Sequence, residues 1–218
     1  NYRTNVLGTK HLLEACQENH VKRFIYCGTI NADLHKRGVY GESKKQAEEL
    51  VKKSGLEYVI LKLNMVYGRG DSNLSKTIAL IKKLPVVPII GGGNQKMQPV
   101  YVDDVVSVLL RCLREKKFKR RVYNIAGPRS MAFNEYIGAI FAALHLRRIK
   151  IHIPAFLIRW FVMVAGKVFE KIITLELVHA ITQDKSADIS AAQKDLGFKP
   201  KEFTTVLQEL IREDKKIS

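Results

Sequence analysis

Apolar and polar residues alternate along the chain in two distinct patterns. Segments with apolar residues three or four positions apart predict amphipathic helices, at residues 5–17, 40–53, 73–83, 105–114 and 132–144. Between them, short and mostly apolar runs predict strands, at residues 21–27, 58–63, 86–90 and 122–126. Helices and strands in this order, with short connections, predict parallel strands joined by right-handed crossovers. We therefore expect an α/β fold built on a doubly wound parallel sheet.

Local signals refine several of these boundaries. Residues 86–90 contain a proline, so an edge position suits that strand. The Gly-Gly-Gly-Asn sequence at 91–94 predicts a turn, and residues 98–102 are expected to be extended. Asp103 and Asp104 are expected to cap the helix that follows. The Leu-Gly-Phe-Lys-Pro sequence at 196–200 predicts a helix stop.

The most apolar stretch of the chain covers residues 151–173. Four charged residues interrupt it, so its apolar runs are far shorter than the roughly 20 residues that span a bilayer. They are Arg159, Lys167, Glu170 and Lys171. We expect a buried or interfacial amphipathic helix here, with Pro154 near its N-terminus.

Candidate chemistry gathers where the predicted strands end. Thr29 follows one strand, residues 64–68 follow the next, and Tyr40 opens the helix between them. Ligands of doubly wound sheets bind at the carboxyl ends of the strands. Tyr40 and Lys44 form a Tyr-x-x-x-Lys pattern, and residues four apart share one helix face. A lone Tyr-x-x-x-Lys pattern usually lies on a solvated helix surface. Because Thr29 is expected at the same strand edge, we treat this pattern as a candidate site.

A phenol beside an ammonium group suits proton transfer. An unperturbed tyrosine has a pKa of about 10, and a nearby cation favours the phenolate and lowers that pKa. Tyr40 and Lys44 are therefore a plausible acid/base device for interconverting an alcohol and a ketone.

The formal net charge is +16, and part of it lies between residues 111 and 121. Such charge attracts nucleic acid, anionic lipid or phosphate-bearing ligands. Aromatic residues do not interleave at stacking spacing and no nucleic-acid motif is visible, so no nucleic-acid partner is expected. Solvated helix ends and loops are the default interpretation, and a role at a membrane surface is the second.

Cysteine usage indicates a reducing compartment. Cys16, Cys27 and Cys112 lack metal-binding or disulfide spacing and read as small buried hydrophobic residues. A cytoplasmic protein, peripheral to a membrane in the second interpretation, is therefore expected.

Six separated motifs resemble the extended short-chain dehydrogenase/reductase superfamily, in its NAD-dependent epimerase/dehydratase group. They are Asn-Val-Leu-Gly-Thr at 5–9, the strand ending in Thr29, Tyr-Gly-Glu-Ser-Lys at 40–44, Tyr-Gly at 67–68, Tyr-Val-Asp-Asp at 101–104 and Leu-Gly-Phe-Lys-Pro at 196–200. The likeness covers nearly the whole chain and implies a Rossmann-like sheet that binds NAD or NADP.

The resemblance also implies the roles of three catalytic residues. Thr29 lies eleven positions before Tyr40, as the family pattern requires. It would hydrogen-bond the substrate oxygen while Tyr40 transfers the proton. Lys44 would bind the nicotinamide ribose and depress the pKa of Tyr40.

Further cofactor contacts follow from the same resemblance. Leu63 and Asn64 match the segment beneath the nicotinamide, and Asn5 matches a position beside the cofactor. A helix cap is an equally good interpretation of Asn5.

Two departures from the family pattern matter. The glycine-rich turn, and the residue that selects NAD or NADP, would precede Asn1, so we expect an N-terminally truncated sheet that lacks its first strands. Such a chain should bind dinucleotide poorly and expose an apolar sheet edge. Second, Met97 and Gln98 occupy the positions of an Arg-Asp pair that meets the diphosphate in nucleotide-sugar enzymes. Lys96 is adjacent and offers a replacement cation, although lysine lacks the bidentate fork of arginine.

These observations leave more than one function open. Residues 1–148 are expected to form a partial NAD(P)-binding domain, with substrate-lobe segments inserted at about 69–100, and residues 149–218 a helical substrate or interaction lobe. The leading hypothesis is an oxidoreductase or epimerase that transfers hydride at a carbinol or ketone carbon. A nucleotide sugar is one candidate substrate, and a homodimer is one candidate oligomeric state.

The sequence at 98–102 also resembles the atypical branch related to the accessory dehydrogenase-like subunit of mitochondrial complex I. The alternatives are therefore a non-catalytic cofactor-binding assembly subunit and a membrane-surface reductase of lipid-like or sterol-like ketones.

Overall fold

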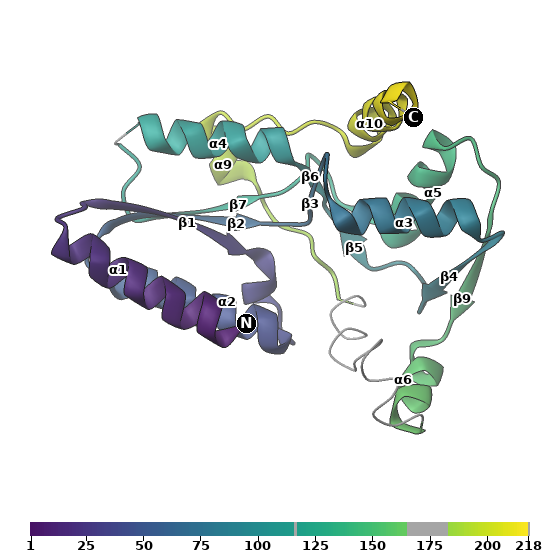
Figure 1. The fold of residues 1–218 in the computed structure, drawn as a ribbon, viewed down its shortest axis with the longest axis horizontal. Helices are drawn as coiled ribbons and strands as arrows, with labels where there is room; N and C mark the ends of the chain where they lie inside the picture. The colour runs from purple at the N-terminus through teal and green to yellow at the C-terminus, as the bar shows by residue number, and fades with distance from the viewer. Residues whose placement is uncertain (116, 165–182, 218) are drawn as a thin grey trace.

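A three-layered α/β unit contains the amino-terminal part of the chain. The computed structural model describes residues 1–115, 117–164 and 183–217. Its main sheet is parallel, with the order β1 (Arg23–Thr29), β2 (Glu57–Leu63) and β7 (Arg121–Ile125). Helices α1 (Gly8–Glu18) and α2 (Gly38–Lys53) cover one face, and α4 (Val102–Arg114) and α9 (Ser190–Leu196) cover the other (Figure 1). The predicted doubly wound α/β fold is confirmed.

Strand register aligns the carboxyl ends of this sheet. Thr29 pairs with Leu63, and Leu63 pairs with Ile125. A polar residue that follows any of these strands therefore lies at the same edge. In the described part of the chain, β1 pairs only with β2 and is an edge strand.

Successive residues of β2 face opposite layers, as the pleat of a strand requires. Ile60 packs with Ala47 and Val51 of α2, whereas Val59 and Leu61 pack beneath α4. This burial on both faces explains why β2 is a continuous apolar run in the sequence.

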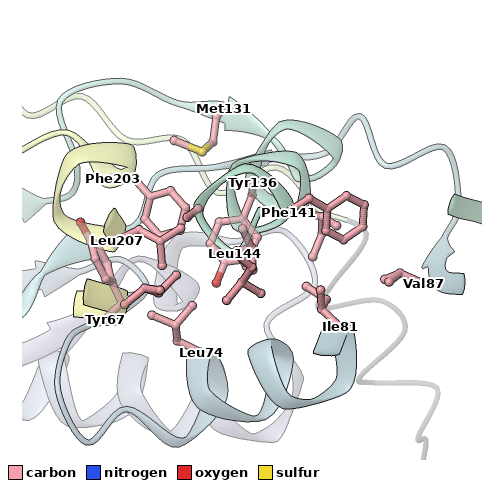
Figure 2. Close-up of a cluster of buried hydrophobic side chains, with 14 of the residues drawn as sticks. Tyr67, Leu74, Ile81, Val87, Met131, Tyr136, Phe141, Leu144, Phe203 and Leu207 are labelled. Carbon is pink, nitrogen blue, oxygen red and sulfur yellow. The ribbon is translucent and has the colours of Figure 1, made fainter. Parts of the chain in front are cut away.

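A second hydrophobic core lies beside the sheet. Helices α3 (Ser72–Lys83), α5 (Phe133–Ala143) and α10 (Phe203–Ile217) surround it. Figure 2 shows its side chains converging, with Phe203 stacked on Tyr136 at 4.8 Å between ring centroids. The segment 187–198 instead packs in the core beneath α4. A division of the chain after residue 148 therefore does not separate the two cores.

In the described residues, three small strand pairs lie outside the main sheet. They are β3 (Val66–Tyr67) with β6 (Val100–Tyr101), β5 (Lys96–Met97) with β8 (Met131–Ala132), and β4 (Val86–Ile90) with β9 (Ile149–Ile153). The β4–β9 pair is parallel and two-stranded, so the edge position predicted for the proline-containing strand is confirmed. The short helices η1 (Arg3–Leu7) and η2 (Ile30–Asp33) complete the described elements before α2.

The helix predicted over residues 151–173 is wrong at its start. Residues 151–153 belong to β9, and α6 (Ala155–Val164) begins directly after Pro154. The sequence Ile-Lys-Ile-His-Ile alternates with period two, and this alternation suits pairing with β4. Residues 165–173 lie outside the described residues.

The start of α4 also differs from the expectation. The N-cap residue is Tyr101, without a side-chain hydrogen bond, and Asp103 and Asp104 lie inside the first turn. The Asp104 carboxylate accepts a hydrogen bond from the backbone N–H of Lys201 instead, at 2.8 Å. At the other end of the chain, Gly197 ends α9 in the left-handed conformation with φ 57°, as predicted.

Two expectations from composition, the burial of the cysteines and the solvated basic stretch, can be compared with the structure. Cys112 is buried, but Cys27 is exposed, so the expectation that all three cysteines are buried is wrong for Cys27. Part of the basic stretch near residue 115 is neutralised, because Arg111 and Lys117 both pair with Glu115. Among the described helices, none has the length and apolar character needed to cross a membrane.

Candidate functional site

The Thr29 hydroxyl and the Tyr40 phenol meet at the carboxyl edge of the sheet. Thr29 is the last residue of β1, and its Oγ1 accepts a hydrogen bond from Asn31 N at 3.3 Å. This bond caps η2, the short turn that returns the chain toward the start of α2. The Thr29 hydroxyl also lies close enough to the Tyr40 phenol to lower the pKa of that phenol. Thr29 therefore serves both as a turn hydroxyl and as the partner of Tyr40.

The environment of Tyr40 raises the pKa of its phenol. Burial disfavours the phenolate and raises the pKa, and the hydrogen bond from Thr29 opposes this effect. The residue is nevertheless 46% exposed, so its ring borders open space. The expectation that Lys44 depresses the pKa of Tyr40 below its ordinary value is wrong in this structure.

Lys44 is held by the backbone of β1 and does not drive the phenol to ionise. Its Nζ donates a hydrogen bond to the Cys27 carbonyl at 2.8 Å and lies 4.5 Å from the centroid of the Tyr26 ring. Burial lowers the pKa of the Lys44 ammonium. Lys44 therefore places a positive charge one helical turn from Tyr40, while its nearest acceptor is a carbonyl oxygen.

Asn5 fixes the first turn of α2. Its Nδ2 donates to Ser43 Oγ at 2.9 Å, and Ser43 Oγ donates to the Tyr40 carbonyl at 2.8 Å. Asn5 lies inside η1, a π-helical turn whose N-cap is Tyr2 without a side-chain bond, so the helix-cap interpretation does not hold. Asn5 thus joins η1 to the first turn of α2 through Ser43.

Leu63 and Asn64 lie at the same edge. Leu63 pairs directly with Thr29, and Asn64 follows it. The Asn64 amide is buried, donates to the Lys185 carbonyl at 2.6 Å, and accepts from Met65 N at 2.7 Å. Asn64 therefore anchors the segment around Lys185 across the strand ends.

A network of ion pairs around the buried residues Lys62 and Glu48 lies next to this edge. Lys62, beside Thr29 in the sheet, donates to both carboxylate oxygens of Asp33 at 2.8 Å. Its Nζ also lies 3.1 Å from the fully buried Glu48, which is 2.7 Å from Lys52 Nζ. The contacts to Glu48 are close in distance but lack hydrogen-bond geometry, so attraction between the charges holds them. The network ties η2, β2 and α2 together.

A cavity of about 290 Å³ opens next to this edge. Its lining is mostly apolar and is formed by Met65, Pro88, Ile90, Gln95, Met97, Phe133, Gln183 and Lys185. The Gln183 side chain donates to the Lys36 carbonyl at 2.8 Å and accepts from Lys36 N at 3.1 Å. The cavity is therefore joined to the loop that precedes Tyr40.

Sequence reasoning missed Lys185 and placed Lys96 at the site. Burial lowers the pKa of the Lys185 ammonium, which lines the cavity. Lys96 is exposed on β5, and its backbone bonds to Asp184 and Lys185, whereas its neighbour Met97 forms part of the cavity wall. No sequence signal marks Lys185, because it lies in a short polar stretch without periodicity.

Gln98 also differs from a diphosphate-binding residue. It is buried, its Nε2 donates to the Gly127 carbonyl at 2.8 Å, and its Oε1 accepts from Ala187 N at 2.8 Å. Its amide thus holds two backbone segments together.

Within the described ranges, no group of three His, Cys, Asp or Glu residues is arranged to hold a metal ion.

Known proteins are similar to this chain in sequence. UDP-glucose 4-epimerase of Vibrio cholerae is 26% identical over 216 residues, covering 90% of this chain and 64% of that protein. The NADH dehydrogenase [ubiquinone] 1 alpha subcomplex subunit 9 of Arabidopsis thaliana is 28% identical over 123 residues, covering 56% of this chain and 31% of that protein. The chain thus spans less than two thirds of the length of these relatives.

A solved structure has the same fold as this chain, and a family sequence pattern matches its amino-terminal part. The crystal structure of UDP-glucose 4-epimerase from Thermotoga maritima superposes with a TM-score of 0.75 at 21% identity, over 99% of this chain and 71% of that chain, which shows a shared fold. The sequence pattern of the NAD dependent epimerase/dehydratase family matches residues 1–126. The match covers more than half of the 218 residues. The chain belongs to the NAD dependent epimerase/dehydratase family.

Proposed function

We propose that the protein is an NAD- or NADP-dependent oxidoreductase or epimerase in which Tyr40 transfers a proton to or from a substrate oxygen. The observation that carries this proposal is the closeness of the Thr29 hydroxyl, at the end of β1, to the Tyr40 phenol in the first turn of α2. The nicotinamide, when bound, would supply the acceptor or donor of a hydride at a carbinol or ketone carbon. Family membership supports the choice of cofactor.

The residues at this edge fit a nicotinamide nucleoside. Tyr40 is half-exposed, and Lys44 offers an ammonium group suited to ribose hydroxyls. Leu63, at the end of β2, offers an apolar contact for the ring, and Asn64 would border it while anchoring Lys185. Asn5 would act through Ser43 on the start of α2.

The raised pKa of Tyr40 favours the protonated phenol over the phenolate. At neutral pH the phenol is protonated and ready to donate to a carbonyl oxygen as that carbonyl is reduced. Oxidation of an alcohol needs the phenolate, and the hydrogen bond from Thr29 favours that form.

The substrate that we propose first is a nucleotide sugar. The relatives include UDP-glucose 4-epimerase of Vibrio cholerae and dTDP-D-glucose 4,6-dehydratase of Dictyostelium discoideum. A diphosphate needs a cation, and two lysines lie near the cavity. Because Lys185 lines the cavity and Lys96 lies on the exposed strand β5, we assign the phosphate contact to Lys185 before Lys96.

A second candidate function is favoured by Met97 and Gln98. An apolar cavity wall and a buried structural amide occupy the positions expected for an Arg-Asp pair. This substitution favours either a cofactor-binding assembly subunit or a reductase of lipid-like or sterol-like ketones. A 3beta-hydroxysteroid-dehydrogenase/decarboxylase of Arabidopsis thaliana is also a relative, 26% identical over 238 residues.

Replacing the phenol oxygen tests the proposal. In a full-length version of the protein, NAD(P)H absorbance would follow reduction of a steroid ketone. Chromatography of the sugar nucleotides would follow turnover of UDP-glucose, because an epimerase regenerates its cofactor. Wild type, Tyr40→Phe and Tyr58→Phe would be compared. We expect Tyr40→Phe to lower turnover by about 10² or more, the span of general acid/base catalysis. Tyr58→Phe is the matched control, because Tyr58 lies near the opposite end of β2. Turnover within a few-fold of wild type in Tyr40→Phe contradicts the proposal, and cofactor-induced thermal stabilisation without turnover supports the assembly subunit.

A further inference from the structure

An exposed apolar face forms where β9 leads into α6. Five large side chains lie on it, and three of them are more than half exposed: Ile149 at 66%, Phe156 at 66% and Trp160 at 59%. The other two are Ile151 and Leu157. We call these five residues the β9–α6 face. Contiguous exposed apolar surface of this kind marks an interaction site.

Hydrogen bonds prevent β9 from turning these isoleucines inward. Successive strand residues point to opposite faces. The alternate residues Lys150 and His152 both contact Asn134, through Lys150 Nζ to the carbonyl at 2.5 Å and His152 Nε2 to Oδ1 at 3.1 Å. The outward direction of Ile149 and Ile151 is therefore fixed by the fold.

The face continues toward the cavity. In the β4–β9 register, Pro88 pairs with Ile151 and Ile90 pairs with Ile153. Paired residues share a face of a sheet, and Pro88 and Ile90 both line the cavity. A surface that covers the β9–α6 face would therefore lie next to the cavity.

The surrounding sequence is strongly basic. Residues 72–102 and 136–164 contain no Asp or Glu and together carry eight Lys or Arg residues. They are Lys76, Lys82, Lys83, Lys96, Arg147, Arg148, Lys150 and Arg159. Strand pairing between β4 and β9 brings the two stretches together, and Arg148 donates to the carbonyls of Ile81 and Lys82. Strands β4 and β9 and helix α6 lie at the end of the molecule away from α1 and α2 (Figure 1).

We propose that the β9–α6 face docks onto a membrane surface that carries anionic phospholipid headgroups. Apolar side chains with a tryptophan suit the boundary between headgroups and acyl chains, and the cations attract anionic lipid. A second copy of the chain is a poor occupant, because a two-fold contact sets the same surface against itself and would oppose like charges. The proposal is independent of the reaction at Tyr40.

The chain carries its own reporter of this docking. Trp160 is the sole tryptophan, so the intrinsic fluorescence reports the β9–α6 face alone. Trp160 emission would be titrated with vesicles of phosphatidylcholine alone and of equal parts phosphatidylcholine and phosphatidylglycerol. We expect a blue shift, and quenching by brominated acyl chains, with the anionic vesicles. Raising NaCl from about 0.1 M to about 1 M shortens the screening length from about 10 Å to about 3 Å and should weaken binding.

Variants that keep the tryptophan locate the contact. Phe156→Ser should weaken vesicle binding by about tenfold or more, because burial of a phenyl ring contributes at least that factor. Leu113→Ser is the matched control, since Leu113 is 63% exposed on α4, on a different element from the β9–α6 face. Both side chains are exposed, so both variants should fold, which far-UV circular dichroism would verify.

Three outcomes would overturn the proposal. The first is an unchanged Trp160 emission with anionic vesicles, and the second is equal binding to both vesicle types. The third is an equal loss in Leu113→Ser and Phe156→Ser. Quenching of wild type by brominated lipid needs no variant, so the proposal stays testable even if Phe156→Ser fails to fold.

Discussion

The carboxyl edge of the sheet and the β9–α6 face are built in opposite ways. At the sheet edge, Thr29, Tyr40 and Asn64 are polar, and hydrogen bonds between side chains and backbone hold each of them. On the β9–α6 face, Phe156 and Trp160 are apolar and largely exposed. Hydrogen bonds of the fold position the side chains of the first region. The apolar side chains of the second region are exposed and are not packed into a core. This contrast is what separates a candidate reaction site from a candidate docking site.

The largest expected effect concerns the network beneath the sheet edge. Lys62→Met should lower the free energy of unfolding by about 3 kcal/mol, because it removes a buried cation from the fully buried Glu48. Chemical denaturation would measure the change. Lys10→Met is the matched control on α1, since Lys10 pairs with the exposed Glu14 at 3.7 Å and should contribute less than about 1 kcal/mol. Equal losses in the two variants would show that the buried network does not stabilise this edge.

A smaller effect is expected on the pH dependence of the proposed reaction. Thr29→Ala removes the hydrogen bond that favours the Tyr40 phenolate, so the pKa of Tyr40 should rise further. Alcohol oxidation, which needs the phenolate, should then begin to rise at a pH higher by up to about one unit, equivalent to about 1.4 kcal/mol. The pH profile of kcat/KM would measure this shift. Thr29→Ser keeps the hydroxyl and should keep the profile, whereas the same displacement in Thr29→Ser would rule out this role of the hydroxyl.

The smallest effect is expected on the β9–α6 face. Trp160→Ser and Phe156→Ser should change the free energy of unfolding by less than about 0.5 kcal/mol, because both side chains are largely exposed. Thermal unfolding without lipid would test this. A much larger loss would mean that these residues stabilise the fold, and the contrast between the two regions would disappear.

The sheet and its helices were predictable from the sequence because local patterns determine them. The continuous apolar run of β2 and the period of α2 identified those elements to within two residues of their bounds. By contrast, β9 was assigned to a helix. Its identity as a strand depends on pairing with β4, about 60 residues earlier in the chain. The period-two alternation of residues 149–153 is a local strand signal, and the interpretation of the apolar residues 151–173 as one helix overlooked it.

The candidate site was partly predictable for the same reason. The order of motifs placed Thr29, Tyr40 and Lys44 at one strand edge, because parallel strands share an edge. The Cys27 carbonyl that holds Lys44, and the chain crossing that brings Lys185 to Asn64, depend on tertiary contacts between residues far apart in sequence. Hence the closeness of Thr29 and Tyr40 was predictable, but the pKa direction of Tyr40 was not.

A double-mutant cycle tests most directly whether Thr29 and Tyr40 act as one unit. Turnover would be measured in wild type, Thr29→Ala, Tyr40→Phe and the double variant. Residues that act together lose function non-additively. We predict that the double variant is no slower than Tyr40→Phe alone, because the Thr29 hydroxyl acts through the phenol. Losses that multiply in the double variant would contradict the account.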